Sequence, residues 1–397
     1  MKWRYPLSDI GFGKQEEQAV LRVLHSRWLS TGPVTEKFEN TFSEYLGEAY
    51  AVAVSNGTAA LHLALAGLGI KEGDEVILPS LTFVATANAV RYVGAKPVFA
   101  DVTGFEDLNI SPRETEAKIT QRTKAIMVMH YGGYPCDMQP IMDIAKRRGL
   151  YVVEDAAHAP GAEYQGKKCG VLGDMGCFSF FSNKNLVTGE GGMVVTQRKE
   201  WAEKVRRMRS HGMQALSWDK YHGHLSSYDI ETLGYNYRTT EIQSALGLAQ
   251  LKKLDRNNRK RKKLVEIYRN ELQGTEEISV PYSHFKGIPS YHLLPILVAP
   301  FLDRNRVIEK LKDFGIQSSI HYPPVHLFSL YRNQFGYKKG DLPKTEEISQ
   351  REITLPLHPL LDVGDVKWIA KKLEEAIRIE IRATHRSASV SARRHES

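Results

Sequence analysis

Residues 150–195 read LYVVEDAAHAPGAEYQGKKCGVLGDMGCFSFFSNKNLVTGEGGMVV, and this stretch decides the fold class. Short runs of β-branched, aromatic and other apolar residues predict buried strands at 151–153, 177–181 and 193–196. Asp155 comes just after the first run, and Lys184 comes just after the second. Ligands of open α/β sheets bind beyond the carboxyl ends of the strands, so both side chains are candidates for a site.

The residue types in this stretch favour one kind of ligand. One carboxylate, one lysine and small hydroxyls such as Ser179 and Ser182 suit a cofactor with a basic ring nitrogen, an aldehyde and a phosphate. Pyridoxal phosphate (PLP) has all three groups. Each residue alone has an ordinary alternative: Asp155 as a helix cap, Lys184 as a solvated loop residue, and the glycines as turn formers. Their joint order favours the cofactor.

The motifs EDAA and SF…K…GEGG in this stretch resemble the core of the DegT/StrS-type sugar aminotransferases, which have the fold-type I architecture of PLP enzymes. The resemblance implies that Asp155 pairs with the pyridine nitrogen and that Lys184 attaches the cofactor covalently. It also implies that His158 lies near the phenolic oxygen of the cofactor. A few relatives carry histidine at the lysine position and catalyse dehydration, so lysine here favours transamination.

Two further motifs are expected to contact the cofactor. A predicted strand, the turn Ser55-Asn56-Gly57-Thr58 and a helix start form an anion site, because free backbone N–H groups and the helix dipole favour a phosphate. Simple N-capping is the alternative. The turn also resembles the family's phosphate-binding motif, which implies contacts from Gly57 and Thr58. By the same resemblance, Phe83 lies against the cofactor ring, although a lone phenylalanine is more often a core residue.

Later motifs imply a second subunit and a substrate region. The sequence GYNYR at 234–238 resembles a family segment whose asparagine reaches the phosphate of the neighbouring subunit. This implies a homodimer with shared sites, with Asn236 in that role and Arg238 nearby. The sequence HYPPVH at 321–326 resembles a substrate-binding region, so Tyr322 and His326 are substrate candidates. An ordinary loop asparagine, a surface arginine and a structural histidine are the alternatives.

The length and composition limit the classes of protein to which this chain can belong. With 397 residues, 42% of them hydrophobic and 25% charged, the chain has ordinary globular values and room for two domains. No apolar run approaches the length of a membrane span, and the first residues do not resemble a secretory signal. The odd number of cysteines, three, fits no metal-ligand spacing and suits reduced thiols. We therefore expect a cytoplasmic protein without a metal site.

The net charge of +8 is local. Residues 252–263 (KKLDRNNRKRKK) carry eight bases and one acid, and residues 385–397 carry three arginines and one glutamate. These two segments account for the whole excess. A basic segment of this kind can form a nucleic-acid-binding surface, but it is more often the solvated face of a helix. No nucleic-acid partner is therefore expected.

The order of the predicted elements indicates an α/β fold. Strands and helices alternate through the first 200 residues, which predicts a doubly wound, mostly parallel sheet. We expect a large PLP-binding domain over 1–254, a smaller C-terminal α/β domain over 255–384, and a disordered tail over 385–397.

The predicted function is a two-stage PLP-dependent amino transfer from an amino acid, by resemblance glutamate, to a keto sugar. The resemblance further implies a nucleotide-linked sugar and a role in amino-sugar biosynthesis for a surface polysaccharide or a glycosylated metabolite. Three alternatives remain open: a PLP-dependent sugar dehydratase or lyase, a noncatalytic PLP- or sugar-binding regulator, and a nucleic-acid-binding protein.

Overall fold

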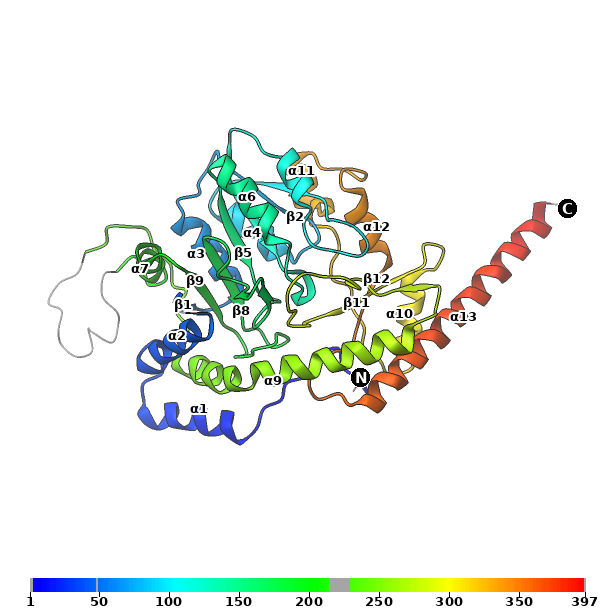
Figure 1. Cartoon of the computed structure of the whole chain (residues 1–397), viewed down its shortest axis with the longest axis horizontal. Helices are drawn as coiled ribbons and strands as arrows, with labels where there is room; N and C mark the ends of the chain where they lie inside the picture. Colours follow the sequence, from blue (N-terminus) through cyan, green and yellow to red (C-terminus); the bar gives the residue numbers. More distant parts are fainter. Residues whose placement is uncertain (1–2, 48, 214–228, 396–397) are drawn as a thin grey trace.

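The computed structural model describes residues 3–47, 49–213 and 229–395, with side chains up to residue 383. Its main feature is a seven-stranded sheet in the order β1-β9-β8-β5-β4-β2-β3 (Figure 1). Strand β9 runs antiparallel to both of its neighbours, β1 and β8, and the other neighbouring strands pair in parallel. The strands are β1 (Tyr50–Val54), β2 (Glu75–Pro79), β3 (Lys96–Ala100), β4 (Thr123–Met129), β5 (Tyr151–Asp155), β8 (Met175–Ser179) and β9 (Gly192–Thr196). This is the predicted doubly wound, mostly parallel sheet.

Helices cover both faces of the sheet because its strands are apolar on both faces. In β1, Val52 and Val54 pack in one cluster with α3 (Gly57–Gly67), α4 (Val84–Tyr92) and α7 (Lys199–Met208). The alternate residues Ala51 and Ala53 pack in another cluster with α2 (Pro33–Tyr45). Strands β2, β4 and β5 pack against α6 (Met138–Arg148) on the face that α2 also covers. Successive residues of a strand point to opposite faces, which explains this division.

A second, antiparallel sheet has the order β10-β11-β12. Its strands are β10 (Ile278–Ser279), β11 (Leu294–Val298) and β12 (Glu352–Leu355). Its apolar residues form one core with α10 (Arg304–Asp313), the end of α12 (Pro343–Arg351), and the first part of α13 (Val363–His395). Smaller elements are β6 (Glu163–Tyr164), β7 (Lys167–Lys168), α5 (Pro112–Ala117), η1 (Tyr131–Gly133), η2 (Val325–Leu327) and α11 (Ser329–Phe335).

Helix α9 (Glu241–Leu272) runs along both sheets (Figure 1). In its first half, Leu251 and Leu254 join the core beside α2, whereas Leu264, Val265 and Tyr268 in its second half join the core of the second sheet. The helix also contacts α1 (Lys14–Ser26) and α13. The predicted domain boundary between residues 254 and 255 therefore falls inside one continuous helix.

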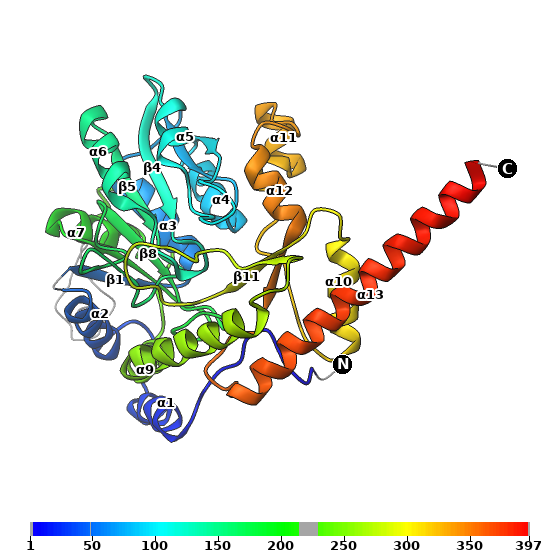
Figure 2. The ribbon, with the colours of Figure 1, turned by 45° about the vertical axis from the view of Figure 1, so that its right-hand side comes forward.

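The expectation for the C-terminal tail differs from the structure. Helix α13 continues to His395 and extends away from the body (Figure 2), so residues 385–395 are helical where disorder was expected. Residues 382–395 contain no glycine or proline that would end the helix. The last two residues of the predicted tail lie outside the described residues.

No helix in the described ranges combines the length and apolarity needed to cross a membrane.

Candidate active site

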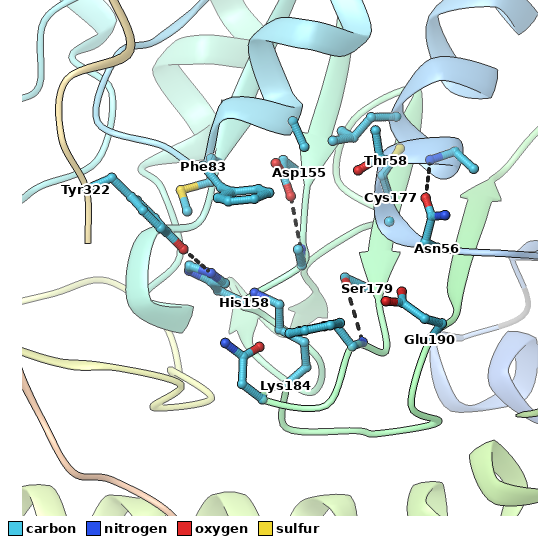
Figure 3. A pocket seen from close by; sticks show the side chains of 18 of the residues that line it. Asn56, Thr58, Phe83, Asp155, His158, Cys177, Ser179, Lys184, Glu190 and Tyr322 are labelled. Atoms are coloured by element: carbon cyan, nitrogen blue, oxygen red, sulfur yellow. Dashed lines mark hydrogen bonds between the residues drawn. The ribbon is translucent and has the colours of Figure 1, made fainter. Parts of the chain in front are cut away.

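A cavity of about 660 Å³ lies at the carboxyl ends of β5 and β8. Figure 3 shows its labelled side chains around one hollow. The predicted site residues that line it are Gly57, Thr58, Phe83, Asp155, His158, Ser179, Lys184 and Tyr322. Strands β5 and β8 are adjacent and parallel, so Asp155 at the end of one and Lys184 beyond the end of the other face the same space.

Asp155 is the last residue of β5, and 5% of it is exposed. Its Oδ2 accepts a hydrogen bond from Thr86 Oγ1 at 2.8 Å, and its Oδ1 accepts one from the Ala157 N–H at 3.2 Å. Thr82 Oγ1 lies 2.7 Å from Thr86 Oγ1. Burial raises the pKa of Asp155, while Thr86, the Ala157 amide and the Lys184 ammonium act against this shift. A cationic partner in the cavity would therefore stabilise the carboxylate further.

Lys184 follows β8 in a loop that is fixed by backbone contacts. Its N–H donates to the Phe181 carbonyl at 2.9 Å, and the Thr188 N–H donates to the Phe180 carbonyl at 2.9 Å. Burial lowers the pKa of the Lys184 amine to about 8, and Asp155 acts in the opposite direction. The amine therefore loses its proton more easily than an exposed lysine and is suited to attack a carbonyl carbon.

The N-terminus of α3 forms another side of the cavity. Asn56 caps this helix, because its Oδ1 accepts the Ala59 N–H at 2.8 Å. No hydrogen bond within the described chain engages the N–H groups of Gly57 or Thr58. A Cβ at Gly57 would lie 2.7 Å from Ser179 Cβ, so glycine permits the close approach of the helix to β8. Free N–H groups, the helix dipole and the Ser179 hydroxyl are the features that can bind an anion here.

His158 and Tyr322 close the side near Phe83 (Figure 3). The Gly132 N–H donates to His158 Nδ1 at 3.3 Å, and His158 Nε2 lies 3.0 Å from the Tyr322 hydroxyl. Burial holds the pKa of His158 well below its ordinary value, with Lys184 acting in the same direction, so the ring is neutral. Because Nδ1 accepts, Nε2 carries the hydrogen and donates to Tyr322. The Tyr322 ring lies 6.0 Å from that of Phe83.

Four predicted residues do not line this cavity. The Ser182 hydroxyl donates to the Gly189 carbonyl at 3.2 Å, and Arg238 Nη1 donates to the Ser210 hydroxyl at 3.1 Å. Asn236 is exposed. His326 is buried, with Nδ1 2.7 Å from Ser80 Oγ and Nε2 3.2 Å from Glu346. Both ring nitrogens of His326 are thus engaged in the core, so the structure gives no support to the prediction that His326 binds substrate.

Other lining residues were not predicted. They include Tyr92, Cys177, Asn183, Glu190, Tyr237 and His321. Asn183 precedes Lys184, and its Oδ1 is buried without a hydrogen-bond partner among the described residues. His321 precedes Tyr322. Proximity in sequence to a predicted residue is the signal that could have found these two.

The chain matches the model of the DegT/DnrJ/EryC1/StrS aminotransferase family over residues 12–374. It belongs to this family. The aminotransferase is 39% identical to a GDP-perosamine synthase of Escherichia coli O157:H7, with 91% of this chain and 95% of the relative covered. The predicted family, fold class and enzyme class are confirmed.

Solved structures agree with this assignment. Helicobacter pylori PseC, an aminotransferase involved in the biosynthesis of pseudoaminic acid, matches with a TM-score of 0.88 and 33% identity over 94% of this chain and 98% of that one. The PLP form of Spr1654, a putative sugar aminotransferase from Streptococcus pneumoniae, matches with a TM-score of 0.87 and 29% identity, covering 95% and 98% of the two chains. The relatives thus include enzymes of amino-sugar biosynthesis and a PLP-bound structure.

Proposed function

We propose that this aminotransferase uses PLP to move an amino group from an amino acid, in our proposal glutamate, to the keto group of a nucleotide-linked sugar. The observation that carries the proposal is that Lys184, Asp155 and the free N–H groups of Gly57 and Thr58 line one cavity. The GDP-sugar named for the Escherichia coli relative and the roles in sugar chemistry named for the two solved structures support a nucleotide-linked acceptor.

The residues present fit PLP. The buried Asp155 carboxylate matches a protonated ring nitrogen, and the N-terminus of α3 with Ser179 matches a phosphate. Lys184 would hold the aldehyde carbon covalently, and Phe83, which is 55% exposed, offers an apolar face to the ring. When bound, PLP supplies an electron-withdrawing ring that stabilises negative charge on the substrate carbon bearing the nitrogen.

The chain's own groups then handle the protons. The neutral Lys184 amine takes a proton from the α-carbon of the donor and returns one when the amino group is passed on. Asp155 stays ionised because a cation beside it offsets its burial. His158 stays neutral and holds the Tyr322 hydroxyl at the cavity wall. The second stage repeats these steps in reverse on the keto sugar.

A screen with pyridoxamine phosphate tests the acceptor. Protein loaded with pyridoxamine phosphate is expected to regain the absorbance of PLP when a suitable nucleotide keto-sugar is added, because the amino group leaves the cofactor. Lys184→Ala protein loaded in the same way is the control and should not respond. If 2-oxoglutarate restores the PLP absorbance but no member of a panel of nucleotide-linked 3-keto and 4-keto hexoses does, the proposed acceptor class is wrong.

We also propose that the working unit is a homodimer whose subunits share sites. Asn236 is exposed and does not line the cavity of its own chain, so a role at the phosphate requires a second copy. A twofold interface would repeat both sites by symmetry.

Subunit mixing tests the shared site. Asn236→Asp should be inactive because its carboxylate repels the phosphate, and Lys184→Ala should be inactive in its own site. After subunit exchange, about one quarter of the sites in an equal mixture should be intact, since each mixed dimer has one site with both wild-type residues. Exchange is verified with two affinity tags. Absence of recovered activity in verified mixed dimers contradicts the shared site.

We further propose a cytoplasmic location. Cys136, Cys169 and Cys177 are all free and buried, which suits a reducing compartment.

A further inference from the structure

Two buried polar residues lie behind the cavity on β12. Glu352 and Thr354 are two residues apart in this strand, so their side chains point to the same face, and neither is exposed. Their side chains are hydrogen-bonded to each other through Glu352 Oε1 and Thr354 Oγ1. Both also contact His321, which lines the cavity.

Glu352 and Thr354 contact different atoms of His321. The His321 backbone N–H donates to Glu352 Oε2 at 2.8 Å, and His321 Nδ1 lies 2.8 Å from Thr354 Oγ1. Paired backbone bonds between Thr354 and Ser319 hold β12 beside the His321 segment. His321 lines the active-site cavity and also a second, much smaller cavity of about 20 Å³. Because Thr354 engages Nδ1, Nε2 is the ring atom left for these cavities, and no residue of the described chain is hydrogen-bonded to it.

We propose that Glu352 and Thr354 form a relay that sets which ring nitrogen of His321 carries the hydrogen, and therefore whether His321 offers a donor or an acceptor to the active-site cavity. Glu352 and Thr354 are positioning residues in this proposal, since they act only through His321.

Hydrogen-bond directions define two states. When Glu352 is protonated, the hydrogen is on Oε1, because Oε2 accepts the His321 N–H. Glu352 then donates to Thr354, Thr354 donates to His321 Nδ1, and Nε2 carries the ring hydrogen. When Glu352 is ionised, Thr354 donates to Glu352, His321 Nδ1–H donates to Thr354, and Nε2 becomes an acceptor. The change moves one proton from Glu352 to Thr354 and one from Thr354 to Nδ1, and Nε2 releases one into the cavity.

The electrostatic surroundings place the ionisation of Glu352 close to neutral pH. Burial raises the pKa of Glu352 to about 8, against the opposing effects of Thr354, the His321 N–H and Arg304 on α10. Burial, together with Lys184, lowers the pKa of His321 to about 3, so the ring is neutral in both states. The other titratable groups that face the cluster are Tyr131, Tyr322, His158 and His292. The Tyr131 hydroxyl donates to the His321 carbonyl, and burial lowers the pKa of both histidines, so their rings are neutral.

The relay has a consequence for the reaction, and this consequence rests on the proposed function. Below about pH 8, the Nε2–H of His321 can donate to a carbonyl or hydroxyl oxygen of the bound sugar. Above this pH, the same position presents a lone pair and repels that oxygen. We expect the KM for the keto sugar to rise about tenfold when this hydrogen bond is lost.

The direct test is ¹⁵N NMR of the protein labelled at histidine and free of cofactor. The His321 signals are assigned by their absence in His321→Gln. In the wild type, the ring hydrogen should be on Nε2 at about pH 6 and on Nδ1 at about pH 10, on either side of the Glu352 transition. Lys184→Ala should show the same transition, which excludes titration of the lysine amine as its cause. One unchanged tautomer across this range overturns the proposal.

Variants of the relay sharpen the test. In Glu352→Gln, the amide can accept the His321 N–H and donate to Thr354, so His321 should keep the hydrogen on Nε2 at every pH. Thr354→Ser should keep the wild-type transition, whereas Thr354→Val should remove it. A Glu352→Gln protein that retains the wild-type transition contradicts the proposal. These NMR results need no cofactor or sugar, so they are independent of whether the proposed amino transfer is correct.

Discussion

Replacing Lys184 with alanine is expected to lower kcat for amino transfer by at least about 10³-fold, because the variant lacks both the covalent attachment and the base at the donor carbon. The fold should be retained, since no residue in the described chain accepts a hydrogen bond from the side-chain amine. The measurement is the rate at which glutamate converts the PLP-loaded protein to its pyridoxamine phosphate form.

Lys168→Ala is the matched control. Lys168 Nζ lies 2.7 Å from Glu163 Oε1, outside the cavity, in a partly exposed pair. Such pairs contribute little to stability, and this one has no contact with the reacting groups, so the glutamate half-reaction should proceed at the wild-type rate. Wild-type rates in the Lys184→Ala protein would show that another residue acts as the base.

Asp155→Asn is expected to lower kcat about 10²-fold or more, which corresponds to a few kcal/mol at the transition state. The amide oxygen can still accept the Thr86 hydroxyl, so shape and packing are preserved, but the negative charge is lost. Without this charge the cofactor's ring nitrogen loses its proton more readily and stabilises negative charge less well. PLP is expected to remain bound through Lys184, and rapid-mixing absorbance measures the slower proton removal.

Asp174→Asn controls for loss of a half-buried carboxylate elsewhere, just before β8. Asp174 accepts the Val152 N–H at 2.8 Å near the amino ends of β5 and β8, away from the cavity, and burial raises its pKa as it does that of Asp155. Its asparagine variant should keep a kcat close to that of the wild type. Equal losses in the two variants would mean that the Asp155 effect is structural.

The sequence predicted which residues come together where a local pattern or the geometry of the strands determines their positions. Asp155 and Lys184 are 29 positions apart, but the rule that ligands bind at the carboxyl ends of parallel strands is enough to bring them together. An anion-binding role for the turn before α3 could also be predicted from local sequence, because a helix N-terminus carries free N–H groups wherever it occurs.

Contacts between distant segments could not be predicted in this way. Thr86 holds Asp155, and Glu352 holds the His321 backbone, through packing that no local pattern encodes. The basic residues of 252–263 also differ in their surroundings, which the composition alone did not indicate. Arg261 is buried and donates to the Leu357 carbonyl at 2.6 Å, and Lys253 pairs with Glu16 at 2.5 Å.

One helix runs through the domain boundary that the sequence predicts after residue 254. Helix α9 continues there because residues 255–272 contain no proline or glycine, and its apolar residues contact first one core and then the other.

The central claim is that Lys184 holds PLP in the cavity that Asp155 also lines. The most direct measurement is borohydride reduction of the PLP-loaded wild-type protein, followed by peptide mapping with mass spectrometry. The expected result is one modified peptide, with the added mass of the reduced cofactor on Lys184. Modification of a different lysine in place of Lys184, or a PLP-saturated protein with no modified peptide, would contradict the account.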